Sequence, residues 1–162
     1  MSDFKGLVEQ ISIELKNRGM MIATAESCTG GMVAAAITAR PGSSSVFDRG
    51  FVTYSYESKE ELLNVSREIL EKHGAVSPEC AVAMAHGALD RSWADLAISI
   101  TGIAGPDGGM EGKPVGLVYI GYGLRDGPVE VQEHHFSGDR DLVREQTVTA
   151  ALTLALTTLK GL

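Results

Sequence analysis

The stretch TAESCTGG, residues 24–31, decides how the chain is expected to fold. It follows a short apolar run, residues 20–23, and leads into a segment of helical character, residues 32–39. A short apolar run followed by a glycine-containing turn and a helix is typical of a buried strand that passes into a helix. The same eight residues include a carboxylate, hydroxyls, a thiol and two glycines. A turn requires only one or two residues of these types. The stretch is therefore also a candidate functional site.

The rest of the chain repeats this alternation of helix and strand. Helical spacing or helix-start signals predict helices over residues 4–18, 34–39, 59–63, 66–73, 78–92 and 139–159. Short apolar runs predict strands over residues 20–23, 51–53, 96–100, 117–122 and 129–136, the last two joined by a turn at 125–128. This order predicts an α/β fold, a single three-layer α/β/α domain over residues 1–162 with a mixed β-sheet.

Composition narrows the classes of partner. Hydrophobic residues make up 44% of the 162 residues, the net charge is −7, and Lys and Arg are scattered along the chain. These properties argue against nucleic acid or a membrane as partner, and no apolar run reaches the roughly 20 residues of a membrane span. The polar N-terminal segment does not resemble a signal peptide. Cys28 and Cys80 have no metal-ligand or CxxC spacing, so we expect a cytoplasmic protein with free thiols.

Four polar loops follow predicted strands, at residues 24–31, 54–59, 101–116 and 137–140. In open α/β sheets, ligands bind beyond the carboxyl ends of the strands. The four loops are therefore candidates for one shared site.

In the first loop, Ser27 precedes a helix start, where backbone N–H groups and the helix dipole favour an anion or an oxyanion. Thr29, Gly30 and Gly31 allow a ligand to approach the backbone closely. The alternative is that Ser27 or Thr29 only caps the helix.

In the second loop, Tyr54 ends a strand and Lys59 stands at or near a helix start. The helix dipole there disfavours a cation and lowers the pKa of an ammonium group, as burial does, and a neutral lysine is a base. The alternative is a solvated lysine among glutamates, whose negative charge would raise that pKa instead.

The third loop, TGIAGPDGG, places Thr101 and Gly102 at a strand end and has exposed N–H groups, although it is not a P-loop. A long solvent loop is the alternative to a ligand cradle. In the fourth loop, Asp139 is the expected N-cap of the last helix. Arg140 and Arg144 lie one turn apart, and either is suited to grip a phosphate, with surface solvation as the alternative.

The four histidines form no metal-ligand pattern, so no metal and no cofactor is expected. No GxSxG motif is present, and no histidine is well placed for a Ser-His-Asp triad. If Ser27 is a nucleophile, lysine is the more plausible base.

Taken in series, the motifs resemble the CinA C-terminal family from about Phe4 to Leu159. They are TAESCTGG, GSS at 42–44, RGFVTYSYESK, HGAVSP at 73–78, ITGIAGPDGG with KPVG at 113–116, and FSGDR at 136–140. Stand-alone members of that family are nicotinamide-nucleotide amidohydrolases, and longer relatives carry a further N-terminal domain. The resemblance implies hydrolysis of the carboxamide of nicotinamide mononucleotide to nicotinate mononucleotide and ammonia.

Carried over residue by residue, the resemblance makes Ser27 the nucleophile, with Lys59 and Tyr54 as its catalytic partners. It implies substrate contacts from Ser44, Thr101 and Arg140. We further expect Thr29, Gly30 and Gly102 to contact substrate, with an oxyanion held by N–H groups at the helix start. The chain departs from the family pattern at Tyr56, Ser58 and residues 107–112, which bears on substrate preference.

Two other interpretations stay open. One is a nucleotide-binding module without chemistry, and the other is an interaction module in competence or damage response. The expected partner is a small-molecule substrate, with a homo-oligomer possible.

Overall fold

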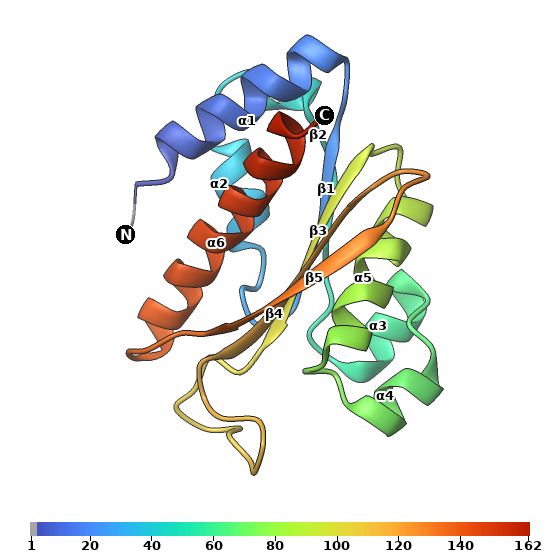
Figure 1. Cartoon of the computed structure of the whole chain (residues 1–162), viewed down its shortest axis with the longest axis vertical. Coiled ribbons are helices and arrows are strands. Elements are labelled where there is room, and N and C mark those ends of the chain that lie inside the picture. Colours follow the sequence, from blue (N-terminus) through green and yellow to red (C-terminus); the bar gives the residue numbers. More distant parts are fainter. Residues whose placement is uncertain (1–2) are drawn as a thin grey trace.

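The computed structural model describes residues 3–162 and has one five-stranded sheet (Figure 1). Its strands are β1 (Ile22–Glu26), β2 (Phe47–Val52), β3 (Leu96–Gly102), β4 (Leu117–Leu124) and β5 (Val129–His135), in the order β2-β1-β3-β4-β5. β1 runs parallel to β2 and β3, whereas β3–β4 and β4–β5 are antiparallel. The predicted mixed sheet is therefore confirmed.

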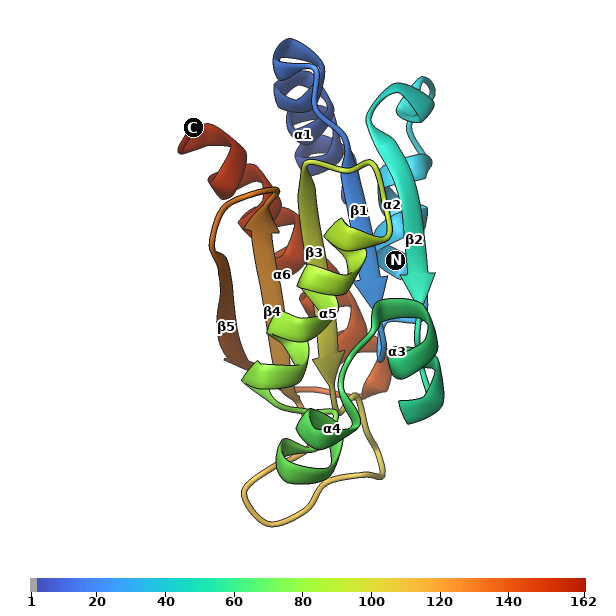
Figure 2. The ribbon, with the colours of Figure 1, turned by 90° about the vertical axis from the view of Figure 1, so that its right-hand side faces the viewer.

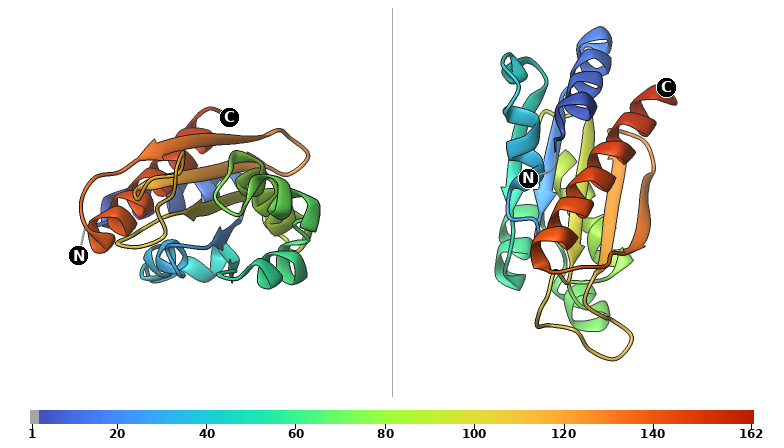
Figure 3. Two further views of the ribbon diagram at one scale, coloured as in Figure 1. Left: turned by 90° about the horizontal axis from the view of Figure 1, so that it is seen from below. Right: turned by 90° about the vertical axis from the view of Figure 1, so that its left-hand side faces the viewer.

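Helices cover both faces of the sheet (Figures 2 and 3). One face carries α1 (Lys5–Arg18), α2 (Met32–Thr38) and α6 (Arg140–Lys160), and the other carries α3 (Tyr56–Leu63), α4 (Arg67–His73) and α5 (Pro78–Asp90). A short 3₁₀ helix, η1 (Ser43–Ser45), precedes β2. The predicted three-layer arrangement is confirmed. Within residues 3–162, no helix combines the length and the apolar character needed to cross a bilayer.

The core has two parts, one on each face of the sheet. Larger aliphatic side chains from α1, α6 and the central strands fill the first part. In the second part, the alanine-rich α5 lies close against β3 and β4. Ser99 Oγ on β3 donates a hydrogen bond to the carbonyl of Ala81 on α5 at 2.5 Å, and a Cβ atom at Gly121 would collide with both groups. Small side chains therefore set the distance between α5 and the sheet.

β1 lies farther along the chain than the sequence predicted. It begins at Ile22 rather than Met20 and continues to Glu26, so the first three residues of TAESCTGG are strand. Met20 N–H still donates to Leu15 O, as part of the C-terminal cap that Gly19 forms on α1 with a φ of 63°. Thr24 and Glu26 are fully buried because β1 is a central strand with helices packed over both faces of the sheet. Because these two side chains are polar, the hydrophobicity pattern did not predict that the strand continues to Glu26.

The prediction of β2 as residues 51–53 was too short, because the strand begins at Phe47. It is an edge strand paired with β1 alone, so polar residues such as Asp48 and Arg49 are tolerated in it. The following helix begins at Tyr56, three residues before the predicted start at Lys59. Ser55 and Ser58 form a reciprocal capping box there. The predicted cap at Asp139 is confirmed, and Ser77 caps α5 in the same way by accepting a hydrogen bond from Cys80 N–H.

A substitution at Gly87 tests how closely α5 packs against α3. A Cβ atom at this position would overlap the carbonyl group of Leu63, which is backbone and cannot move aside alone. We expect Gly87→Ala to lower the free energy of unfolding by about 2 kcal/mol, which corresponds to a fall in Tm of roughly 4–8 °C for a chain of this size.

Gly6→Ala is the matched control, because Gly6 lies in α1 and, within residues 3–162, no atom apart from its chain neighbours and the adjacent helix backbone comes within 4 Å of the position that its Cβ would take. There the better helix propensity of alanine should raise stability by up to about 1 kcal/mol. Thermal unfolding followed by circular dichroism measures both. Equal Tm changes in the two variants would contradict the close contact.

Candidate active site

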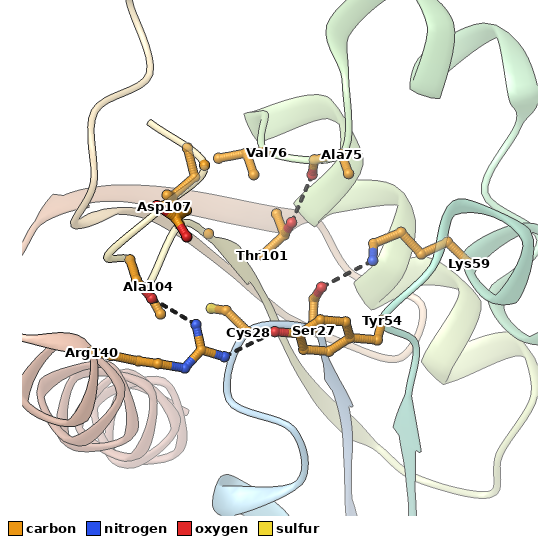
Figure 4. A pocket seen from close by; sticks show the side chains of 14 residues that line it. Ser27, Cys28, Tyr54, Lys59, Ala75, Val76, Thr101, Ala104, Asp107 and Arg140 are labelled. Carbon is orange, nitrogen blue, oxygen red and sulfur yellow. Dashed lines mark hydrogen bonds between the residues drawn. The ribbon is translucent and has the colours of Figure 1, made fainter. Parts of the chain in front are cut away.

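A cavity of about 240 Å³ opens at the end of the sheet where β1, β2 and β3 finish (Figure 4). Its wall consists of segments 27–28, 75–76, 101–105 and 107–108 and of the side chains of Tyr54, Lys59 and Arg140. All four loops that the sequence singled out contribute to it. Residues 75–76 form a fifth segment of the cavity wall. In the sequence, only the HGAVSP motif at 73–78 pointed to this segment.

Ser27 and Lys59 are in direct contact in this cavity. Ser27 is the first residue after β1, and its N–H donates to Ile100 O at the end of β3. Lys59 lies near the first turn of α3, and its Nζ is 3.0 Å from Ser27 Oγ and 2.5 Å from Thr53 O. The hydroxyl and the amine thus come from elements 32 residues apart in the chain.

Lys59 is almost completely buried, with 1% of its surface exposed. Burial disfavours the charged ammonium and lowers the pKa of Lys59 below its ordinary value of 10.5. The interpretation of Lys59 as a solvated surface lysine is therefore wrong. Burial, rather than the helix dipole, is the cause of the shift. Cys28, also in the cavity wall, has a pKa raised to about 12 by burial and stays a neutral thiol.

Glu26 occupies the start of α2. Its carboxylate accepts hydrogen bonds from the N–H groups of Val33 and Ala34, at 2.9 and 3.0 Å, and from Thr29 Oγ1 at 2.7 Å. These helix donors are consequently not available to a ligand, and the predicted oxyanion site at the helix start is wrong. Because Thr29 is buried against Glu26 and Gly30 lies outside the cavity wall, the structure does not place either at the cavity. Both act in the turn that presents Ser27.

Arg140 reaches the cavity from the start of α6. Its Nη1 donates to Gly105 O at 2.8 Å, and its Nη2 donates to Tyr54 Oη at 3.0 Å. Tyr54 is 62% exposed, and its hydroxyl faces Arg140 rather than the Ser27–Lys59 pair (Figure 4). Arg144 instead binds the carbonyl groups of Cys28 and Thr29, which supports the serine turn from behind. The structure therefore brings Arg140, and not Arg144, into the cavity wall.

Three side chains hold the wall segment around Ala75. Thr101 Oγ1 donates to Ala75 O at 2.7 Å, and Ala75 N–H donates to Tyr56 Oη at 3.2 Å. Lys113 Nζ donates to His73 O at 2.6 Å and so ties the 101–116 loop to the same segment. Thr101 and Gly102 both line the cavity, as expected. Tyr56, which departs from the family pattern, has a structural role here.

Ser44 is the one implied substrate residue that lies far from the cavity. It belongs to η1, which precedes the amino end of β2, whereas the cavity lies beyond the carboxyl end of that strand (Figure 2). The strand between them is roughly 17 Å long at about 3.3 Å per residue. Within one chain, Ser44 does not reach a ligand that contacts Ser27.

No group of three or more His, Cys, Asp or Glu side chains in the described residues is arranged to hold a metal ion. The polar side chains of the cavity are instead three hydroxyls, a thiol, a buried amine, a guanidinium and the carboxylate of Asp107. Asp107 was part of the TGIAGPDGG loop in the sequence, but nothing in the sequence distinguished it from its neighbours.

The fold and the cavity together define a three-layer α/β protein with a serine hydroxyl and a buried lysine amine in contact. Residues 4–159 match the CinA C-terminal domain, and the chain belongs to that family. The resemblance inferred from the motifs is confirmed.

Named relatives agree with this membership. The nicotinamide-nucleotide amidohydrolase PncC of Escherichia coli is 52% identical over 151 residues, which cover 93% of this chain and 92% of the relative. The CinA-like protein of Citrifermentans bemidjiense is 49% identical over 150 residues, and the chain spans only 36% of its length. The crystal structure of the competence/damage inducible protein CihA from Agrobacterium tumefaciens superposes with a TM-score of 0.94 at 45% identity, covering 99% of this chain and 97% of that one.

Proposed function

We propose that this protein is a nicotinamide-nucleotide amidohydrolase that converts nicotinamide mononucleotide into nicotinate mononucleotide and ammonia. The observation that carries the proposal is the 3.0 Å contact between Ser27 Oγ and the buried Lys59 Nζ in an open cavity. The E. coli relative of nearly equal length, named for this activity, supports the choice of substrate. The direct experiment is to measure ammonia release when the purified protein is mixed with nicotinamide mononucleotide.

The chemistry begins with proton transfer from Ser27 to Lys59. Because burial lowers its pKa, Lys59 holds a larger fraction of neutral amine than an exposed lysine, and neutral amine accepts the Ser27 proton. Ser27 Oγ then forms a bond to the amide carbon, and the C=O π electrons move to oxygen. When this tetrahedral species collapses, the C–N bond breaks, Lys59 returns its proton to the leaving nitrogen, and ammonia departs.

The remaining acyl-enzyme is an ester of Ser27. Water attacks its carbonyl carbon while Lys59 again accepts a proton. The ester C–O bond then breaks, Lys59 returns that proton to Ser27 Oγ, and the acid product leaves and loses its own proton to solvent as the carboxylate. Thr53 O, which accepts a hydrogen bond from Lys59 Nζ, keeps the amine directed at Ser27 throughout.

The developing oxyanion needs donors other than the α2 N–H groups that Glu26 occupies. The backbone N–H group of Cys28 directly follows Ser27 in the cavity wall and donates to no backbone oxygen within residues 3–162. We assign it this role. One such donor is typically worth about 2.7–4 kcal/mol in acyl transfer.

Arg140 suits the phosphate of the substrate. It lies at the start of α6, where the helix dipole also favours an anion, and a guanidinium binds phosphate through paired N–H donors. Its contacts with Gly105 and Tyr54 fix the guanidinium in the wall. Tyr54 then contributes to substrate binding by orienting Arg140, at a distance from proton transfer.

A nucleotide-binding module without chemistry explains less of this structure. Holding a phosphate requires neither a buried lysine nor its contact with a serine hydroxyl, and burying an amine is costly. The Ser27–Lys59 pair therefore favours an enzyme.

The first prediction concerns Ser27→Ala. Without the hydroxyl no acyl-enzyme forms, so kcat should fall by at least about a thousandfold. Tm and the dissociation constant for nicotinamide mononucleotide should stay close to wild type, because the change removes one oxygen atom from a cavity wall. Ammonia release, thermal unfolding and calorimetry supply the three measurements. Turnover near the wild-type rate would remove Ser27 from the nucleophile role.

The second prediction concerns pH. In the free enzyme, Lys59 is a protonated and inactive ammonium below its pKa and a neutral base above it. We therefore expect kcat/KM to rise with pH to a plateau, and the midpoint of the rise to lie below 10.5, the ordinary pKa of a lysine. Lys59→Arg should lose at least about a thousandfold in kcat, because a guanidinium stays protonated.

Lys72→Arg is the control, since Lys72 is an exposed lysine on α4. It should leave both the rate and the pH profile unchanged. An active Lys59→Arg enzyme would show that the residue supplies charge rather than a base.

The third prediction separates phosphate binding from chemistry. Arg140→Ala should raise KM for nicotinamide mononucleotide by about 10-fold or more, because a charge-assisted contact with phosphate is lost. Nicotinamide riboside, which lacks the phosphate, should be a poor substrate of the wild type and lose little further in the variant. Steady-state ammonia release with both compounds measures this. Equal losses for both would mean that Arg140 acts elsewhere than on the phosphate.

A further inference from the structure

The cavity holds one carboxylate that the proposed mechanism does not use, that of Asp107. Among the residues that line the cavity, all within 3–162, Asp107 is the one acidic residue. Its side chain projects from the 101–116 loop toward the space in front of Ser27 and Thr101 (Figure 4). No hydrogen bond or ion pair joins its carboxylate to any other described residue.

The backbone around Asp107 is held in place by its neighbours. Arg140 donates to Gly105 O at 2.8 Å, two residues before Asp107. The base of the loop is closed by Ile103 N–H on Leu117 O at 2.9 Å and by Gly116 N–H on Ile103 O at 2.7 Å. Farther along, Lys113 anchors the loop to His73 O. These contacts keep the part of the loop that carries Asp107 against the cavity.

The charges of the cavity match those of an oxidised nicotinamide nucleotide. Such a ligand carries a phosphate anion and a pyridinium cation in addition to its neutral carboxamide. Arg140 complements the anion, and Lys59 is neutral when it acts as a base. Asp107 is then the one cavity group whose charge complements the ring.

We propose that Asp107 is a specificity-determining residue that recognises the positive charge of the pyridinium ring and so selects oxidised over reduced nicotinamide mononucleotide. This rests on the proposed function. The reduced nucleotide has the same carboxamide, ribose and phosphate, but its dihydropyridine ring is neutral. A comparison of the two ligands therefore isolates the charge of the ring from every other contact.

The test is a binding measurement with Asp107→Asn, which keeps the size of the side chain and removes its charge. Dissociation constants for the oxidised and reduced mononucleotides are measured by calorimetry in the Ser27→Ala background, so that no ligand is consumed. Because Asp107 is exposed to solvent, its attraction to the ring is partly screened. Asp107→Asn should weaken the binding of the oxidised nucleotide about three- to tenfold and change that of the reduced one by less than about twofold.

Glu111→Gln is the matched control, since Glu111 is an exposed carboxylate of the same loop outside the cavity wall. Glu111→Gln changes the net charge by the same amount as Asp107→Asn and should alter neither of the two dissociation constants. Equal effects of Asp107→Asn on both ligands would overturn the proposal, because Asp107 would then act through Arg140 and the phosphate. No effect on either ligand, or no binding of the oxidised nucleotide, would also overturn it.

Failure of the proposed function has a different signature. If the wild-type protein binds the oxidised nucleotide but releases no ammonia from it, the hydrolysis is wrong. The ratio of the two dissociation constants would still report whether Asp107 recognises the cation. If ammonia is released and Asp107→Asn leaves the ratio of the two dissociation constants unchanged, the proposed hydrolysis is supported and the proposed role of Asp107 is wrong.

Discussion

The burial of Lys59 is the constraint on which the site depends. An amine enclosed by α3, β1 and the end of β2 is costly to protonate, and its hydrogen-bonding capacity is directed to Ser27 Oγ and Thr53 O. The same enclosure lowers the pKa of Lys59 and fixes the position of its amine beside Ser27 Oγ. In the mechanism proposed above, one packing arrangement thus supplies both properties that a general base needs. The capping box of α3 fixes the start of the helix from which the lysine enters the cavity.

A second constraint comes from Glu26. By binding the first N–H groups of α2 and the hydroxyl of Thr29, its buried carboxylate forms an internal anion site that belongs to the protein itself. The turn between β1 and α2 is thereby held in place, and Arg144 braces it from α6 through the carbonyl groups of Cys28 and Thr29. Ser27 is presented by a hydrogen-bonded turn that is formed before any ligand arrives, which is the preorganisation that acyl transfer requires.

The outer part of the cavity is built from segments distant in sequence. Arg140 crosses from α6 to the 101–116 loop and to Tyr54, while Thr101, Tyr56 and Lys113 hold the segment around Ala75. The Ser27 hydroxyl and the Lys59 amine thus lie at the inner end of the cavity, and the Arg140 guanidinium and the Asp107 carboxylate lie in its outer wall. The proposed function assigns chemistry to the first pair and charge recognition to the second. That division follows from the topology, because loops from both halves of the sheet meet beyond the carboxyl ends of β1 and β3.

The sequence by itself determined the layer architecture, the mixed sheet, the cap of α6 at Asp139 and the loops that form the cavity, because periodicity, Gly and Pro positions and capping residues are local signals. It also singled out Ser27, Lys59, Thr101 and Arg140. It did not determine the extent of β1 and β2, since Thr24 and Glu26 are buried only because helices distant in sequence cover both faces of β1, and Asp48 is tolerated only at a sheet edge. Only the tertiary structure decided that Glu26 takes the α2 donors, that Arg140 rather than Arg144 lines the cavity, and that Ser44 lies at the opposite end of the sheet. Each of these depends on which segments distant in sequence come within hydrogen-bonding distance, and no local pattern encodes that.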